Sequence, residues 1–427
     1  MAIISETVKV MKGYTLHIVK TEKYKTNTFV WKMKSPLKKE SLTERALLPY
    51  VLQSSSKKYP TTTSLRTYLD DLYGASLFVD LAKKGEYHII SFSIDIPNEK
   101  FLSNQTSLLR KAIELLAEIL KNPNMNESSF DKDTVEREKR TLKQRIQSIY
   151  DDKMKYSSNR LVEEMCEGEL YSLPTHGQMD HVDSITQESL YNYYEQAFNE
   201  DELDLYVIGD VNVEEVTAVA DEFLQFSNRT PQIVEKQAAS AAIDQVKEVK
   251  ENQDVKQGKL NIGFRTNVYY GDQDYYALQV FNGIYGGFSH SKLFINVREK
   301  ASLAYYAASR LESHKGLMMV MSGIDNKNYD QTVSIIKEQM ESMKSGDFSD
   351  QELEQTKAVI KNQMLETIDS ARGIVEVLYH NVVAKANVTL DSWLEETDKV
   401  SKEDVVKVAQ KTHLDTIYFL TGLEAGK

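Results

Sequence analysis

The stretch TERALLPYVL at residues 43–52 decides both the fold and the chemistry of this chain; KKYPT follows at 57–61 and LDDLYGAS at 69–76. Three of its side chains, Ala46, Pro49 and Tyr50, determine what the stretch can bind. Alanine and proline carry no side-chain donor atom, and a lone phenol is a poor ligand for zinc. These three positions are therefore unable to hold a metal ion.

A second segment, VEREKRTLKQRI at residues 135–146, carries Glu138 and Arg145 at a separation of seven residues. Seven residues make two helical turns, so the two side chains share a helix face without touching each other directly. The guanidinium of Arg145 is permanently charged and has no lone pair to donate to a cation. This segment therefore offers one carboxylate and one fixed positive charge.

Together the two segments resemble the N-terminal half of the inverzincin metallopeptidases (insulinase, pitrilysin, mitochondrial processing peptidase), whose signature is H-x-x-E-H. The resemblance places Ala46 and Tyr50 where two histidines bind zinc, and Pro49 where a glutamate activates water. It places Arg145 where a downstream glutamate is the third ligand. The resemblance implies a peptidase frame that has lost its metal site, so we expect no cofactor in this chain and zinc only in a partner subunit.

Composition narrows the class of protein. The chain has 427 residues, of which 41% are hydrophobic and 27% charged, which suits two or more soluble domains. A net charge of −12 argues against a nucleic-acid or anionic-membrane partner. The single cysteine, Cys166, excludes an internal disulfide and fits a buried small hydrophobe. No run approaches the ~18 apolar residues of a membrane span, and the first residues show no leader pattern, so we expect a cytoplasmic protein.

The two halves of the chain repeat one pattern at an offset of a little over two hundred residues. Residues 84–95 (KGEYHIISFSID) parallel residues 315–325 (KGLMMVMSGID), and each segment predicts a strand that leaves a Lys-Gly turn and precedes a helix. Each half closes with a helix and a strand, at 203–209 (LDLYVIG) and 416–422 (TIYFLTG). A repeat of this length indicates a duplicated domain rather than a solenoid unit.

We therefore predict an α+β fold of two homologous domains, each with a mostly antiparallel sheet covered by helices, which agrees with the family's pair of domains. Residues 1–228 form the peptidase-like domain with the degenerate zinc motif. The polar residues 229–253 form the linker, and residues 254–427 form the second domain. Residues 256–265 fit the family's edge strand at the start of that second domain.

The second half carries GIYGGFSHSKLFINVREKASLAY at residues 283–305. This stretch resembles the family's C-domain signature: a glycine-rich turn, then L-F-x-x-V-R-E-K, then G-L-A-Y. In that family the arginine and the tyrosine hold the substrate backbone and help to stabilise the oxyanion, which implies these roles for Arg298 and Tyr305. Ser302 departs from the signature because it replaces the glycine before Leu-Ala-Tyr.

Each of these residues also has an ordinary interpretation. Arg298 could be a surface arginine in a salt bridge with Glu299 or Glu312. Gly286 and Gly287 line the substrate chamber in the resembling heterodimers, but glycine pairs are also common in turns. The motifs before and after Arg298 favour the functional interpretation for that residue.

The resemblance implies a non-catalytic subunit of a heterodimeric zinc metallopeptidase. Its partner would be a paralogous, H-x-x-E-H-bearing zinc peptidase, and the pair would bind a peptide or small protein substrate. The alternative is a peptide-binding or scaffold pseudopeptidase without turnover, linked to modification of elongation factor P. A third hypothesis, a hydrolase with a relocated metal site at His176 and His181, is disfavoured because loop histidines five residues apart match no metal-binding motif.

Overall fold

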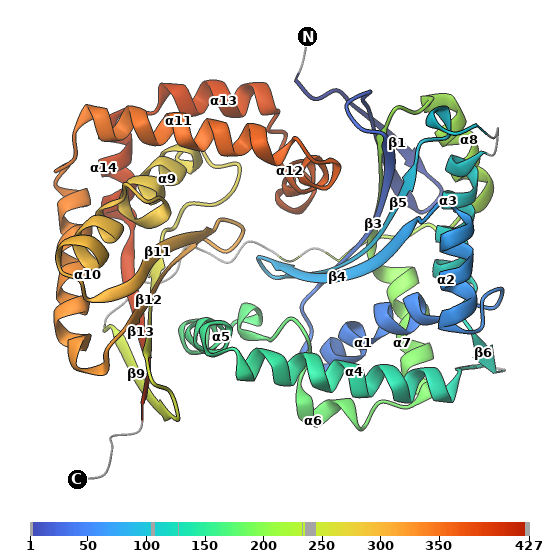
Figure 1. Cartoon of the computed structure of the whole chain (residues 1–427), viewed down its shortest axis with the longest axis horizontal. Coiled ribbons are helices and arrows are strands. Elements are labelled where there is room, and N and C mark those ends of the chain that lie inside the picture. Colours follow the sequence, from blue (N-terminus) through green and yellow to red (C-terminus); the bar gives the residue numbers. More distant parts are fainter. Residues whose placement is uncertain (1–2, 104–106, 127, 233, 235–244, 423–427) are drawn as a thin grey trace. The chain divides into compact units, whose positions relative to one another are not determined.

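Two sheets, each with its own helices, make up the chain (Figure 1). The computed structural model describes residues 3–103, 107–126, 128–232, 234 and 245–422. Its contacts divide the chain into two units. The first comprises Met1–Ser148, Leu173–Val234 and Ser370–Glu376. The second comprises Ile149–Ser172, Glu235–Asp369 and Val377–Lys427.

The first unit is built on a six-stranded sheet with the order β1-β2-β8-β3-β5-β4, in which β2 and β8 run parallel and the other neighbours antiparallel. Its strands are β1 (Glu6–Met11), β2 (Tyr14–Lys20), β3 (Thr26–Pro36), β4 (Ser76–Lys84), β5 (Tyr87–Pro97) and β8 (Glu202–Gly209). A separate small ladder pairs β6 (Met125–Asn126) with β7 (Ser129–Phe130). Its α-helices are α1 (Leu42–Ser54), α2 (Thr62–Asp71), α3 (Leu108–Lys121), α4 (Lys132–Asp151), α6 (Met179–Val182), α7 (Gln187–Glu200) and α8 (Val213–Phe223).

The second unit is built on a five-stranded sheet with the order β11-β12-β10-β13-β9, in which β13 and β9 run parallel. Its strands are β9 (Lys247–Gln253), β10 (Gly258–Arg265), β11 (Ala304–Glu312), β12 (Leu317–Ile324) and β13 (His413–Gly422). Its helices are α5 (Lys153–Met165), α9 (Tyr275–Asn282), α10 (Tyr329–Lys344), α11 (Asp350–Thr367), α13 (Leu390–Lys399) and α14 (Lys402–Lys411), with the π-helical segments η4 (Gly283–Gly287) and η5 (Phe294–Lys300). Helix α12 (Ala371–Ala384) begins with residues of the first unit and continues in the second.

The two sheets share one topology. The order β9-β13-β10-β12-β11 matches β2-β8-β3-β5-β4 strand for strand, and the parallel pair occupies the same place in both. Each Lys-Gly turn joins the last two strands of its order, and Gly85 (φ +55°) and Gly316 (φ +71°) both adopt the left-handed conformation that glycine tolerates. The predicted duplicated α+β fold is confirmed.

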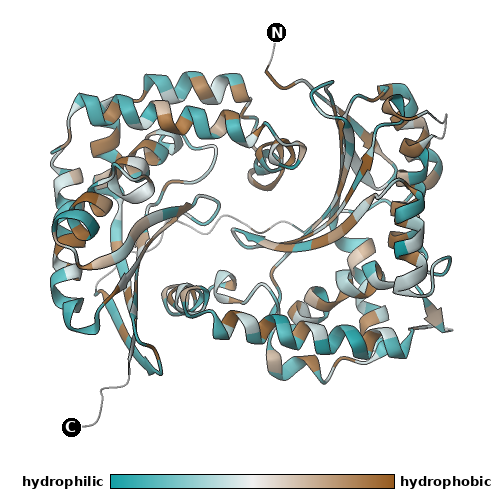
Figure 2. Cartoon of the chain, viewed as in Figure 1, coloured by the Kyte–Doolittle hydropathy of each residue, from teal (hydrophilic) through white to brown (hydrophobic). Residues whose placement is uncertain are grey.

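Alternation along the strands of the first sheet places the core of the first unit on one face. In β3, the side chains of Phe29, Trp31 and Met33 are buried in the core of the first unit, while Lys32 and Lys34 point to the opposite face. Hydrophobic and hydrophilic residues lie side by side along the helices in Figure 2, as expected of helices that bury one face. Within the described residues, no helix is long and apolar enough to cross a membrane.

The opposite face of the first sheet is covered in part by the segment Ser370–Glu376. The carboxylate of Glu376 forms ion pairs with the ammonium groups of Lys32, at 2.6 Å, and Lys84, at 3.2 Å. Burial alone would raise the pKa of Glu376, but the two ammonium groups lower it to about 2. Arg372 pairs with Asp95 on β5. Charge complementarity therefore holds this segment on the sheet of the first unit.

The extent of the linker and the position of one strand differ from the sequence prediction. Residue 233 and residues 235–244 of the predicted linker lie outside the described residues, and Lys247–Gln253 forms the edge strand β9 rather than a linker, with exposed residues alternating along it. The expected edge strand, β10, lies in the middle of its sheet. Its two edges pair with β12 and β13, and α5 packs over one of its faces, where an added Cβ on Gly263 would stand 2.4 Å from the sulfur of Met165. Cys166 is buried in the same cluster.

A buried arginine holds helix α1 in the first unit. The side chain of Arg45 is 2% exposed, and each of its five N–H donors has a partner. Its Nη1 donates to Asp201 at 2.7 Å and to the Tyr193 hydroxyl at 3.0 Å, and its Nη2 donates to the carbonyls of Met33 and His88, both at 3.0 Å. This one guanidinium therefore ties α1 to β3, β5, α7 and the residue before β8.

The fifth donor extends the network into the loop at 173–178. Arg45 Nε donates to Nδ1 of His88 at 3.2 Å, so Nε2 of this imidazole donates to the carbonyl of Thr175 at 2.8 Å. Burial, reinforced by the charge of Arg45, lowers the pKa of His88 to about 3, so the ring is neutral near neutral pH. Gly177 (φ +77°) brings the loop against α1, since a Cβ there would lie 2.8 Å from Cα of Thr43.

We predict that Arg45→Met lowers the free energy of unfolding of the first unit by about 3–5 kcal/mol, because it leaves the carboxylate of Asp201 buried without its ion partner. Adding Asp201→Asn should recover part of this loss, since no uncompensated charge then remains. Thermal unfolding of the single and double variants measures both effects. Arg66→Met, at an exposed arginine on α2, is the matched control and should change stability by less than about 0.5 kcal/mol. An Arg45→Met variant that melts like the wild type would refute the role given to this network.

Candidate functional site

Helix α1 carries the three positions of the degenerate zinc motif, and the structure buries all three. Ala46 is fully buried, Tyr50 is 5% exposed, and Pro49 lies in the interior of the helix. A proline there removes the backbone hydrogen bond to residue 45, and it usually destabilises a helix by about 3 kcal/mol. The packing of α1, which buries nearly every residue from Leu42 to Ser54, compensates for this defect.

Arg145, the fourth degenerate zinc position, contacts Tyr50. Arg145 projects from α4 over the ring of Tyr50, with its guanidinium carbon 3.8 Å from the ring centroid. Burial raises the pKa of Tyr50, and the charge of Arg145 opposes part of that rise. The contact joins two residues, one on α1 and one on α4, that the family resemblance places at zinc-ligand positions.

The carboxylate of Glu138 is held by hydrogen bonds from two side chains. It accepts a hydrogen bond from Ser54 Oγ at 2.7 Å and from Arg137 Nε at 3.1 Å. The Ser54 hydroxyl in turn accepts from Arg137 Nη2 at 2.6 Å. The first glutamate of the motif therefore fastens α4 to the end of α1.

The donor set does not fit zinc. Ala46 and Pro49 offer no donor, Tyr50 is a buried neutral phenol, and Arg145 places a positive charge where the cation would bind. Across the residues that the structure describes, no group of three or more His, Cys, Asp or Glu side chains is arranged to hold a metal ion. The relocated site considered for His176 and His181 is included in that statement.

The second constellation lies wholly in the second unit. An open pocket of about 460 Å³ is formed where η5 leads into β11, and its lining residues are Arg298, Glu299, Ser302, Leu303, Ala304, Tyr305 and Asp325. The structure thus brings together both residues that the signature singled out. The side chain of Tyr305 is 75% exposed, and the exposed Arg298 stacks on Phe294 at 4.5 Å.

The salt-bridge interpretation of Arg298 does not hold in the structure. Glu299 and Asp325 line the same pocket, but within the described part of the chain Arg298 forms no ion pair. A guanidinium without an internal partner keeps its donors for another molecule. The geometry therefore leaves Arg298 and Tyr305 available together on one exposed surface.

Ser302 preserves the turn in which the family signature has glycine. It is one of the few non-glycine residues with a positive φ, at +52°, and Leu303 closes the turn by donating to the carbonyl of Val297 at 3.1 Å. This left-handed conformation costs a side chain roughly 1–2 kcal/mol relative to glycine. The replacement therefore keeps the path of the backbone to Tyr305 at the expense of local strain.

The glycine pair takes no part in lining this pocket. Gly286 is buried, and an added Cβ would stand 2.6 Å from Ser309 Oγ and 2.8 Å from a methyl carbon of Leu293. At Gly287 an added Cβ would stand 3.0 Å from the side-chain nitrogen of Asn282. Close packing explains the need for glycine at Gly286.

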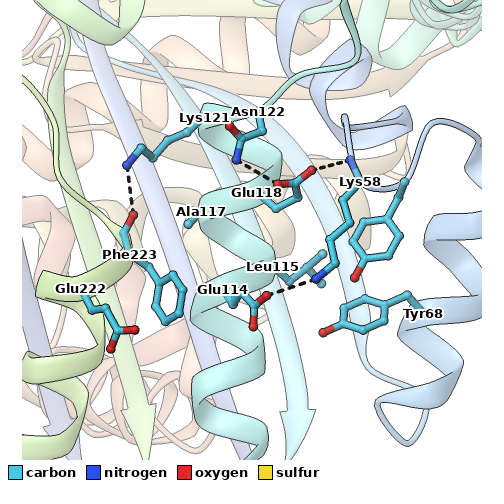
Figure 3. A pocket seen from close by; sticks show the side chains of 11 residues that line it. Lys58, Tyr68, Glu114, Leu115, Ala117, Glu118, Lys121, Asn122, Glu222 and Phe223 are labelled. Carbon is cyan, nitrogen blue, oxygen red and sulfur yellow. Dashed lines mark hydrogen bonds and ion pairs between the residues drawn. The ribbon is translucent and has the colours of Figure 1, made fainter.

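A further pocket in the first unit, of about 350 Å³, is lined by residues of α2, α3 and α8 and of the loop before α2 (Figure 3). Its charged groups already bind one another: Lys58 pairs with Glu114 through its ammonium and donates its backbone N–H to Glu118, which also accepts from Asn122. Lys121 donates to the carbonyl of Phe223. Because these groups satisfy each other, we assign this pocket no role.

We predict that Ser302→Gly keeps or raises the stability of the second unit, whereas Ser302→Val lowers it by about 1–2 kcal/mol relative to the glycine variant, because a β-branched residue is strained at positive φ. The midpoint of thermal unfolding checks the order. The same two changes at Ser289, an exposed serine without a positive φ, are the control and should not favour glycine. Equal stability of the two Ser302 variants would contradict the strained turn.

Comparisons with known proteins identify the family of the chain. Residues 184–360 match the family described as "Peptidase M16 inactive domain". The chain is 54% identical to the "Probable inactive metalloprotease YmfF" of Bacillus subtilis (strain 168), over 99% of each chain. It is 22% identical to the mitochondrial-processing peptidase subunit beta of Saccharomyces cerevisiae, over 69% of this chain and 66% of that protein.

Solved structures extend the likeness to the whole fold. A conserved protein from Enterococcus faecalis V583 superposes with a TM-score of 0.91 at 35% identity, covering 99% of this chain and all of the other. The peptidase M16 inactive domain from Pseudomonas fluorescens superposes with a TM-score of 0.80 at 15% identity and covers 99% of this chain and all of the other, which shows a shared fold. The chain belongs to the M16 (inverzincin) metallopeptidase family, and it is a homologue of an inactive member of that family.

Proposed function

We propose that this chain is the non-catalytic subunit of a heterodimeric zinc metallopeptidase. It binds the peptide substrate and supplies Arg298 and Tyr305 to the active site of a paralogous partner that carries H-x-x-E-H and zinc. The observation that carries the proposal is the open pocket in which these two side chains lie exposed and Arg298 has no internal ion partner. The lost zinc positions, Ala46, Pro49, Tyr50 and Arg145, support it from the other side, since catalysis then requires a second protein.

The chemistry of peptide hydrolysis gives these donors a role. Attack of a zinc-activated water on the scissile carbonyl develops negative charge on the carbonyl oxygen. The guanidinium of Arg298 and the hydroxyl of Tyr305 can both donate to that oxygen or to the neighbouring peptide backbone. Donors that are positioned before the reaction stabilise this charge more than water does, because they need not reorganise.

Three further expectations belong to this proposal. The family resemblance assigns Gly286 and Gly287 to the wall of a substrate chamber. The close packing around Gly286 explains the glycine without that role. The partner is a paralogous zinc peptidase subunit that carries H-x-x-E-H, and the substrate is a peptide or small protein. We place the pair in the cytoplasm, in keeping with a single cysteine that is buried.

A scaffold that binds peptides without turnover in any complex is the second candidate. The loss of the zinc ligands favours it, because binding needs no metal. The expected connection with modification of elongation factor P belongs to this candidate.

We predict that Arg298→Ala lowers kcat of the reconstituted complex by on the order of 10²-fold or more without dissociating it, because an oxyanion contact is made mainly in the transition state. Tyr305→Phe removes only a hydroxyl and should act in the same direction, more weakly. Size-exclusion chromatography and steady-state hydrolysis of a fluorogenic peptide measure assembly and turnover separately. Arg310→Ala, at an exposed arginine on β11 outside the pocket, is the control. Unchanged kcat in an intact Arg298→Ala complex would end the in-trans role and favour the scaffold.

A further inference from the structure

The degenerate zinc site holds a cation that the described part of the chain leaves unpaired. Arg145 is exposed, its guanidinium lies 3.8 Å above the ring of Tyr50, and no carboxylate oxygen comes within ion-pair distance of it among the described residues. Stacking on an aromatic face fixes the plane of a guanidinium, and the N–H groups of Arg145 that do not reach the Tyr50 hydroxyl are available to an anion. The ring of Tyr50 is itself immobilised by burial, so the cation is held in place from below.

A second polar group at this site also lacks a partner. Nδ1 of His176 is buried and accepts or donates no hydrogen bond within the described residues. Burial lowers the pKa of His176, and the charge of Arg145 lowers it further, so the ring is neutral and one of its nitrogens carries a proton. The loop that carries His176 is fixed on both sides, through the carbonyl of Thr175 and through Gly177. Nδ1 of His176 can therefore make one further hydrogen bond.

The two charged side chains that act on this site, Arg145 and Asp80, have opposite signs. The other charged side chain that acts on both Tyr50 and His176 is Asp80, on the edge strand β4. Asp80 disfavours a negative ligand, but it lies beyond ion-pair distance of Arg145, whereas a bound carboxylate would contact the guanidinium directly. Because Coulomb energy falls with distance, the contact with Arg145 outweighs the repulsion from Asp80.

We propose that the degenerate zinc site is a carboxylate-binding site that recognises an acidic side chain of a bound peptide, with Arg145 on the platform of Tyr50 as the anion-binding group and His176 as a further hydrogen-bonding group. The inference rests on the peptide-binding part of the proposed function and names the substrate class. It requires neither a partner subunit nor a metal. A guanidinium recognises the planar carboxylate with two parallel hydrogen bonds, which makes the site selective for glutamate or aspartate over their amides.

The test uses fluorescence anisotropy on the full chain with two labelled decapeptides, both C-terminally amidated. One carries glutamate at alternate positions and the other carries glutamine at the same positions. The wild type should bind the glutamate peptide more tightly, although the chain's net charge of −12 opposes this. Arg145→Gln should weaken binding of the glutamate peptide by about tenfold or more and leave the glutamine peptide unchanged. Asp80→Asn should tighten binding of the glutamate peptide.

Two controls separate the site from general electrostatics. Arg140→Gln changes an exposed arginine on the same helix and should leave the preference intact. Arg145→Lys keeps the charge but loses the planar fork, and it should retain only part of the preference. Thermal unfolding of each variant confirms that it is folded.

The inference is overturned if the wild type shows no preference for the glutamate peptide, or if Arg140→Gln abolishes the preference as completely as Arg145→Gln does. It is also overturned if a glutamine peptide with a free C-terminal carboxylate binds as tightly as the glutamate peptide, since the terminal carboxylate would then be the ligand. An Arg145-dependent preference together with unchanged turnover of the Arg298→Ala complex would support this site and reject the in-trans role. The opposite pair of results would do the reverse.

Discussion

The first unit depends on one buried guanidinium. Arg45 is the residue immediately before the degenerate zinc motif, and its five hydrogen bonds reach two strands, one helix and the residue that precedes β8. Through His88 the same network holds the loop that carries His176. A buried cation is stable only when it is paired and all its donors are satisfied, and Arg45 meets both conditions. Helix α1 is therefore positioned by a polar network next to the former metal site, and its position does not require a metal.

This arrangement accounts for how the fold accommodates residues that no zinc enzyme could use. A proline inside α1 and an arginine in place of a metal ligand would each disturb a functioning site. Here the proline is absorbed by the packing of α1, and the arginine stacks on the tyrosine that occupies another ligand position. The two sheets have the same strand order, but the two units carry different side chains at their candidate sites. The first unit has Arg145 stacked on Tyr50, and the second has Arg298 and Tyr305 exposed in an open pocket.

Sequence reasoning predicted the features that depend on local pattern. The two Lys-Gly turns and the repeated closing strands predicted the duplicated domains. The family resemblance named Tyr50, Arg145, Arg298 and Tyr305, and the structure shows Tyr50 against Arg145 and places Arg298 and Tyr305 in one pocket. Sequence reasoning did not predict that β10 is central, because the two strands that pair with its edges, β12 and β13, lie far from it in the sequence. Nor did it identify β9, whose residues are polar at every position but Val249 and therefore resemble a linker.

The network of Arg45 had no signal of its own in the sequence. Its partners, His88, Tyr193 and Asp201, are spread over more than a hundred residues, and an arginine on a helix usually faces solvent. The unpaired state of Arg145 was equally hidden, since it depends on which carboxylates fail to reach it in three dimensions. The positive φ of Ser302 could have been suspected from the glycine that the family signature has there, but only the structure shows that the turn is kept.

The central claim is that this chain is a member of a zinc peptidase family that binds no zinc of its own. Elemental analysis of the full chain, purified without a metal-affinity tag, tests it most directly. The account predicts far less than one equivalent of zinc per chain, because Ala46, Pro49, Tyr50 and Arg145 provide no ligand set and no other cluster in the described residues replaces them. One equivalent of zinc per chain, lost when His176 or His181 is changed to alanine, would contradict it and would restore the chain to the enzymes of its family.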